Sequence, residues 1–367
     1  MGNQSVTLFQ PLKDLLTPLS HSQCVLHKHE ILICGGVDKK DCYLIIHSKT
    51  NTSLSVRHCV VKLVDSNNKD RNQITLLSFG GEYKHTLVMK YVSVWGDDNN
   101  SDNDNEINKL KKSKKSSNYN EWVHFTDNHN NPTNIRIGDD YNGVRAVIGG
   151  SSNHLLFITN NPKNISVFDL STFQFIKHDT LPTNKKISNH CFISKPENGQ
   201  GILKSNEKKK RKIFMKCCYN NTFQFHKLPV CNDIALFNGY AYVYINDSIL
   251  FFGGSNYPHI SKLVHKYSIQ ENKWMTFRNA LPSPLYGSVA ILSEDSMYVH
   301  IIGGSNGEDV STHMKTQVSE WLSEKEIKKG IELKVKKEEE NEQQDKAKEE
   351  TNDAKEEKDK QNEKEKK

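Results

Sequence analysis

Three histidines each begin a run of apolar residues at widely separated points of the chain, and their residue type suits metal chemistry. His21, His58 and His190 stand in the settings Ser-His-Ser, Arg-His-Cys and Asn-His-Cys. Imidazole is a common ligand of zinc and other transition metals, so three of them at one place can hold an ion. The alternative is that each histidine fills one slot of a structural repeat, and the sequence supplies no independent carboxylate or cysteine ligand. We therefore predict no metal, no cofactor and no catalytic residue.

The eight cysteines also lack the spacing of a metal or redox site. No Cys-x-x-Cys pair occurs, and Cys24, Cys34, Cys59 and Cys191 each lie beside Val, Leu, Ile or Phe. Such cysteines behave as small buried residues of a reducing compartment. A phosphate-binding glycine loop and a nucleophile elbow are missing as well. The sequence thus predicts a non-enzymatic protein of the cytoplasm.

The charge is mildly basic, with 50 Lys and Arg against 44 Asp and Glu and a net charge of +6. The excess lies in two runs, residues 111–115 and 208–212, so we expect no extended basic surface and no nucleic-acid partner. Nuclear import receptors read runs of this kind, which keeps the nucleus as a second compartment beside the simpler interpretation of solvated loops. No apolar run has the length of a membrane span, and no secretory signal begins the chain, so we expect no membrane association.

The elements that must position any site are marked by a Gly-Gly pair that closes a short apolar run in four places. Four or five consecutive apolar residues predict a buried strand, and paired glycines let the backbone leave it through positive φ. Neighbouring pairs at either end of the chain lie about 45 to 50 residues apart, a period typical of β-propeller blades. Gly149-Gly150 precedes an apolar run, which indicates a turn between strands. The four runs are residues 31–36, 76–81, 249–254 and 299–304.

A second repeat, an aromatic strand followed by Leu-Pro, marks the crossing from one unit to the next. Together the two signals predict about six units, of which the first and the fourth are short for four strands. Residues 6–12 form an isolated strand that we expect to complete the last blade and so to remove open sheet edges. The predicted units span residues 21–57, 58–128, 135–181, 182–228, 229–281 and 282–321.

Aromatic spacing within the units adds a family resemblance. Six residues separate Tyr267 from Trp274 and Phe168 from Phe175. The glycine doublet followed by such a pair resembles the Kelch repeat over roughly residues 8 to 322, most clearly in the fifth unit and weakly in the third and fourth. The resemblance implies an all-β, about six-bladed Kelch-type β-propeller, in a divergent form. We assign the propeller to residues 1–322 with a disordered insertion at 97–120. We assign the Glu/Lys-rich residues 323–367 to a solvated tail, helical or disordered, without the apolar stripe of a coiled coil, and a docking helix is the alternative.

The resemblance implies a protein-interaction scaffold. Kelch proteins often bind actin or serve as ubiquitin-ligase adaptors, although we expect no BTB or F-box segment, since the propeller begins within the first dozen residues. Related propellers include metal-dependent oxidases, so a propeller enzyme (oxidase or hydrolase) is the alternative, and a degraded paralogue without activity is a third. Family resemblance places binding side chains in the loops after the glycine doublets and in those that enter each inner strand. These side chains are His21, Asp38, Lys39, Arg57, His58, Glu82, Tyr83, Lys84, His190, Asn256, Tyr257, Tyr286 and Asn306.

Overall fold

The structure, a computed structural model, is all-β and propeller-like. No helix among its described residues is long and apolar enough to cross a membrane. Side chains are not described at 39–44, 49–50, 213–217 and 223–227. The described residues are 8–37, 39–44, 49–50, 57–64, 72–82, 84–93, 119–135, 140–150, 152–181, 187, 189–193, 213–217, 223–227, 234 and 237–332.

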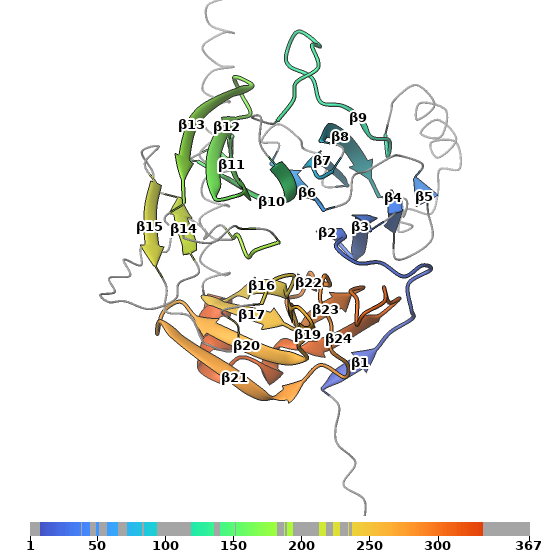
Figure 1. Cartoon of the computed structure of the whole chain (residues 1–367), viewed down its shortest axis with the longest axis vertical. Helices are drawn as coiled ribbons and strands as arrows, with labels where there is room; N and C mark the ends of the chain where they lie inside the picture. The colour runs from blue at the N-terminus through green and yellow to red at the C-terminus, as the bar shows by residue number, and fades with distance from the viewer. Residues whose placement is uncertain are drawn as a thin grey trace, which may run out of the picture.

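Antiparallel sheets stand around a common centre (Figure 1), and five of those in the described ranges have four strands. The first two sheets are β2 (Gln23–His27), β3 (Glu30–Gly36), β4 (Lys39–Leu44) and β5 (Lys49–Thr50), and β6 (His58–Leu63), β7 (Gln73–Gly80), β8 (His85–Val92) and β9 (Val123–His124). The third is β10 (Asp140–Gly149), β11 (Leu155–Asn161), β12 (Asn164–Asp169) and β13 (Gln174–Thr180). The others are β16 (Ala241–Ile245), β17 (Ser248–Phe252), β20 (Leu263–Ser268) and β21 (Lys273–Ala280), and β22 (Val289–Leu292), β23 (Tyr298–Ile302), β24 (His313–Gln317) and β1 (Phe9–Pro11).

Two smaller sheets complete the described strands. β14 (Ile213–Cys217) pairs with β15 (Phe223–Lys227) where the fourth unit is predicted, and β18 (Ser255–Asn256) pairs with β19 (His259–Ile260) in a short hairpin. The first unit holds four strands despite its short sequence, because β5 has only two residues. Most of the fourth unit, and the predicted insertion at 97–120 except its last two residues, lie outside the described ranges. That the fourth unit is a complete blade, which would make six blades in all, therefore stays a prediction.

Burial along each sheet explains the sequence pattern. The second strand lies between neighbouring sheets on both faces, so β3 and β17 are buried at every residue and read as continuous apolar runs. The outer strands β13 and β21 expose most of their residues and carry polar side chains. The predicted aromatic pairs join the outer two strands: the ring centroids of Phe168 and Phe175 lie 5.0 Å apart, and those of Tyr267 and Trp274 lie 5.1 Å apart.

The Gly-Gly doublets form the contacts between neighbouring units. The first glycine of each doublet has positive φ, and a Cβ atom there would overlap the start of the next unit. The absence of a side chain therefore lets two sheets approach closely at the centre. Gly149-Gly150 lies in the turn between β10 and β11, as predicted. The four contacts are Gly35 with His58, Gly80 with Val144, Gly253 with Leu285, and Gly303 with Leu19.

The N-terminal segment completes the last sheet, which confirms the predicted closure. β1 pairs with β24, with Phe9 opposite Thr316 and Pro11 opposite Met314. The strand is shorter than predicted, and residues 1–7 lie outside the described ranges. Proline is tolerated because β1 is the edge strand of its sheet, where no further strand needs its N–H.

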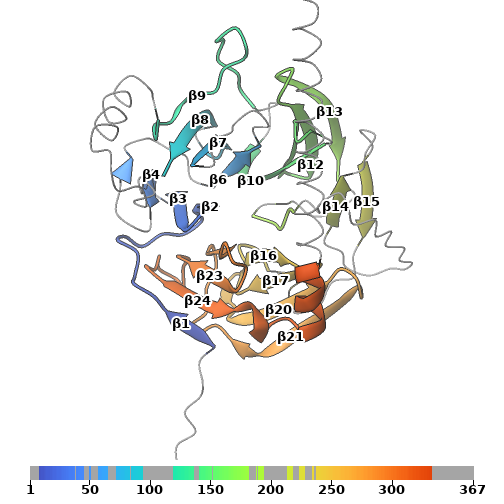
Figure 2. The same ribbon diagram turned by 180° about the vertical axis from the view of Figure 1, so that it is seen from behind.

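Beyond the strands, a short helix docks on the fifth unit. Residues 318–320 form a 3-10 turn, η2 (Val318–Glu320), and residues 324–332 are helical (Figure 2). Ser323 and Glu326 form a capping box, since the Ser323 N–H donates to Glu326 Oε2 at 2.8 Å and the Ser323 Oγ accepts from the Glu326 N–H at 3.4 Å. Glu326 also accepts from Lys266 Nζ at 2.9 Å and from Ser248 Oγ at 3.0 Å. The beginning of the predicted solvated tail is thus bound to the propeller.

This docking predicts an acid-sensitive helix. Burial opposes ionisation of Glu326, but hydrogen bonds from Ser323, Lys266 and Ser248 outweigh it and lower the pKa of the carboxyl from its usual 4.5 to about 2. A lowered pKa in the folded state adds stability that is present above the unfolded pKa and is lost as the pH falls through the folded pKa. We expect the protection factors of residues 324–332 in hydrogen exchange, which compare each measured rate with the intrinsic rate at the same pH, to fall as the pH falls from 4.5 to 2. In Glu326→Gln the exchange should be faster at neutral pH and should lack this acid dependence, and an unchanged pH profile would contradict the docking.

Candidate functional site

One residue with left-handed backbone stands at the start of the inner strand of each predicted unit, and in unit three it lies within β10, where the pairing with β11 is irregular between Asp140 and Arg145. In unit four, residues 190–193 occupy the place of the inner strand, because the backbone N–H groups of Cys191 and Phe192 donate to the hydroxyls of Tyr240 and Tyr242 at the next inner strand. We call these six residues the mouth ring. They are His21 (φ 54°), Arg57 (56°), Gly143 (73°), Asn189 (47°), Gly239 (61°) and Gly287 (67°).

Backbone hydrogen bonds join the mouth ring from unit to unit. The His21 N–H donates to the Gly287 carbonyl at 2.7 Å, and the Gly287 N–H donates to the Gly239 carbonyl at 2.6 Å. On the other side, the Gly143 N–H donates to Arg57 at 2.9 Å and the Asn189 N–H donates to Gly143 at 3.2 Å. These bonds fix the first residue of each inner strand and so determine which side chains enter the centre.

The imidazole of His21 lies over the two glycines of the mouth ring. A Cβ atom on Gly287 would come within 3.0 Å of His21 Nε2, and one on Gly239 within 3.7 Å of His21 Cε1. The Tyr286 ring meets the imidazole edge-on, with centroids 5.8 Å apart. Desolvation by burial, then the charges of Arg57 and Arg145, lower the pKa of His21 to about 4. The ring is therefore neutral at pH 7.

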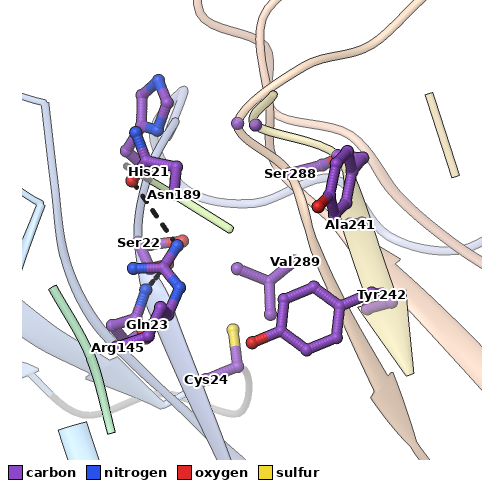
Figure 3. A pocket seen from close by; sticks show the side chains of 14 residues that line it. His21, Ser22, Gln23, Cys24, Arg145, Asn189, Ala241, Tyr242, Ser288 and Val289 are labelled. Carbon is purple, nitrogen blue, oxygen red and sulfur yellow. Dashed lines mark hydrogen bonds between the residues drawn. The ribbon is translucent and has the colours of Figure 1, made fainter. Parts of the chain in front are cut away.

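Inside the mouth ring lies a cavity of about 190 Å³, shown in Figure 3. Its walls come from the starts of four inner strands and from Asn189. The described lining contains hydroxyl, amide, thiol and guanidinium groups together with small apolar side chains, and it contains no carboxylate. The lining residues are His21, Ser22, Gln23, Cys24, Arg145, Asn189, Gly239, Tyr240, Ala241, Tyr242, Gly287, Ser288, Val289 and Ala290.

Arg145 supplies the positive charge of the cavity. Its Nη1 donates to the Val144 carbonyl at 2.9 Å, and its Nη2 donates to Asn189 Oδ1 at 3.5 Å. Both acceptors are neutral, and no carboxylate among the described residues forms an ion pair with this guanidinium. The charge is felt around the whole cavity, because it contributes to lowering the pKa of His21 and favours ionisation of the buried Cys59, Tyr240 and Tyr242.

Hydroxyl groups complete the polar lining. Burial raises the pKa of Tyr242 to about 12, so the phenol stays protonated and bonds to the Phe192 backbone at 3.4 Å. Ser22 is 1% exposed and Ser288 is 7% exposed, and the described part of the chain supplies neither hydroxyl with a hydrogen-bond partner. Buried hydroxyls without partners are uncommon in folded proteins. The cavity wall thus contains two hydroxyls whose hydrogen-bonding capacity is not used by the described residues.

The three histidines that suggested metal binding do not gather at one site. His58 follows the mouth ring by one residue and stacks on His85, with centroids 5.4 Å apart. His190 holds the equivalent position and bonds through Nε2 to Thr159 Oγ1 at 2.7 Å, while His21 is itself a member of the ring. Among the residues that the structure describes, no three His, Cys, Asp or Glu side chains are grouped as a metal ion needs.

The predicted binding side chains lie in different places: at the cavity mouth, in the interior, on the exposed rim and outside the described residues. His21, Arg57 and Tyr286 surround the cavity mouth, whereas His58 is fully buried against Gly35. On the rim, Tyr257 is 95% exposed in the β18–β19 hairpin, beside the half-buried Asn256. Asp38 and Tyr83 lie outside the described residues, as does the side chain of Lys39. The remaining exposed members of the set are Glu82, Lys84 and Asn306.

Comparison with known proteins finds similarity to solved structures but none to a family model or a curated sequence. No protein-family model and no curated protein sequence matches the chain. Among solved structures, 405 chains match. One, described as "Structure of YjhT", is 13% identical with a TM-score of 0.49 and covers 83% of this chain and 95% of its own. A match at that level carries no argument about function.

The sequence pattern did not indicate three residues of the cavity, Arg145, Ser22 and Ser288. A signal for Arg145 exists once the mouth ring is known. Two residues after the ring, the other inner strands carry uncharged residues, namely Gln23, Cys59, Cys191, Ala241 and Val289. A lone arginine at this position of the repeat is the exception that marks the site.

Proposed function

We propose that this chain is a non-enzymatic protein-interaction module, a divergent Kelch-type propeller of six units that binds its partner on the face around the mouth ring. The six members of that ring support the unit count, and the glycine doublets with their aromatic pairs support the Kelch assignment. Rigid sheets hold short loops at this face, so binding depends on loop side chains. Actin and ubiquitin-ligase components remain the partner classes that the resemblance implies.

The observation that carries the proposal is Tyr257. Its side chain is 95% exposed at the tip of the β18–β19 hairpin, although tyrosine normally buries much of its ring. The hairpin is fixed to the mouth ring, because Ser255 and Asn238 exchange backbone hydrogen bonds of 2.9 Å and Asn238 precedes Gly239. An exposed aromatic ring on a fixed support loses little conformational freedom on binding and is typical of the anchor of an interface.

A photo-crosslinking amino acid tests this assignment directly. Placed at position 257 of the full chain in cells, it should give a discrete crosslinked product, because the side chain faces the partner. The same partner should also be captured from a crosslinker at position 306. In that arrangement, Tyr257→Ala should lower the recovery of the crosslinked product by about tenfold or more, as loss of an aromatic anchor does.

Position 297 provides the matched control. Met297 is 59% exposed, but it lies in the turn between β22 and β23, at the end of the inner strand away from the mouth ring. A crosslinker there should capture no discrete product. Equal capture at positions 257 and 297 would place binding elsewhere and would contradict the proposal.

A further inference from the structure

We propose that the central cavity binds the carboxylate of a small organic acid. This inference goes beyond the protein-binding function, because the site lies inside the mouth ring and is built from inner-strand residues that the rim loops do not include. It depends on the charge of the cavity, on its unused donors and on its size.

Arg145 supplies the positive charge that would attract an anion into the cavity. A half-buried guanidinium without a described carboxylate partner keeps a positive charge inside the channel. Burying such a charge without a counterion is costly, so an anion that enters the cavity gains more here than it would at an exposed arginine. Arg57, whose charge also lowers the pKa of His21, adds to the positive potential at the mouth, although it does not line the cavity.

The donors favour a carboxylate over a phosphate dianion. The planar guanidinium matches the two oxygens of a carboxylate in a paired arrangement. Ser22 and Ser288 add hydroxyls that are buried and without partners among the described residues. A dianion calls for a second cation at the ligand, but the described lining holds no lysine and no second arginine, and burial lowers the pKa of its one histidine, His21, to about 4. One carboxylate therefore fits both the number of charges and the number of donors.

The shape of the cavity indicates a short organic tail. Figure 3 shows Arg145, Gln23 and Cys24 on one side, facing Ala241, Tyr242 and Val289 on the other. On the second side, Ala241, Val289 and the ring of Tyr242 give apolar surface that suits the carbon skeleton of the acid, beside the hydroxyls of Tyr242 and Ser288. A cavity of about 150 Å³ is known to hold benzene, so the volume here admits an acid of similar size.

The test uses the full chain with propionate and benzoate, and with propionamide and benzamide as uncharged analogues of the same shape. We expect at least one of the two acids to bind saturably by calorimetry at pH 7 and to raise the melting temperature, and its amide to do neither. If neither acid binds, or if an amide binds as well as its acid, the proposal is overturned. Binding of inorganic phosphate in preference to both acids would overturn the choice of carboxylate.

Variants locate the site within the protein. Arg145→Gln should weaken binding of the acid by about tenfold or more, as expected for loss of a charge-assisted hydrogen bond. The matched control is Arg278→Gln, which removes the same charge from the exposed side of β21 and should bind as the wild type does. If Arg145→Gln fails to fold, Arg145→Lys keeps the charge but loses the paired geometry, and it should still weaken binding. Equal affinity in the Arg145 and Arg278 variants would overturn the proposal.

Discussion

Replacing Gly303 with alanine is expected to lower the free energy of unfolding by about 3–5 kcal/mol, the sum of backbone strain and a steric overlap between units. Gly303 has φ +60°, which alanine adopts only with strain, and its Cβ would fall on the carbonyl oxygen of Leu19. That carbonyl also accepts a 2.7 Å hydrogen bond from the Gly304 N–H. The substitution therefore separates the last unit from the first. Urea unfolding followed by tryptophan fluorescence measures the loss.

Gly307→Ala is the control for this prediction. Gly307 also has positive φ, +128°, but a Cβ there meets no atom within 4 Å. Its loss should be limited to backbone strain, about 1–2 kcal/mol. If both variants lose the same amount, the contact between Gly303 and Leu19 does not hold the last unit to the first.

Much of the fold was predictable because each unit carries its own signals. Runs such as residues 249–252 are apolar throughout, since β17 is buried on both faces, and the glycines that follow must have positive φ for the next sheet to approach. The aromatic pair Tyr267 and Trp274 is a local contact across one tight turn. Such signals depend only on residues that are close together in the chain, so they can be recognised from the sequence without a structure.

The cavity was not predictable in the same way. Arg145 lines one cavity with Ser22 and Tyr242 only because the sheets stand around a common centre, and these residues come from different units. The sequence repeat hides the site as well, because equivalent positions carry different residue types. His58 and His190 share a slot, but His21 stands one residue earlier in its unit, so the three histidines could not converge as the metal hypothesis required.

The sequence favours a solvated tail over the docked helix for a different reason. Residues after 323 are so rich in Glu and Lys that composition alone predicts a solvated tail. The contact depends on one buried cation, Lys266, which is 7% exposed and lies sixty positions before Glu326. A second ion pair joins Lys329 to Asp247 at 3.4 Å. Isolated long-range ion pairs of this kind leave no periodic pattern in the sequence.

Removing the ring of Phe9 is the second substitution with a large expected effect. Phe9→Ala should lower the free energy of unfolding by about 3–5 kcal/mol, as truncation of a buried phenylalanine does. Phe9 is 2% exposed, and its ring lies 5.6 Å from Trp321 and 6.3 Å from Phe252 between centroids. It therefore joins the first described strand to the last unit and to the core of the fifth. The loss is measured by thermal or urea unfolding of the full chain.

Gln10→Ala separates this packing from the strand itself. Gln10 is the next residue of β1, pairs with Lys315 and points its side chain to solvent. Its truncation removes no buried surface and should change stability by less than about 0.5 kcal/mol, as surface substitutions do. A large loss from Phe9→Ala with none from Gln10→Ala means that the N-terminal strand closes the propeller through its apolar face. If Phe9→Ala is as mild as the control, β1 contributes hydrogen bonds only, and the closure must rest on the Gly303–Leu19 contact.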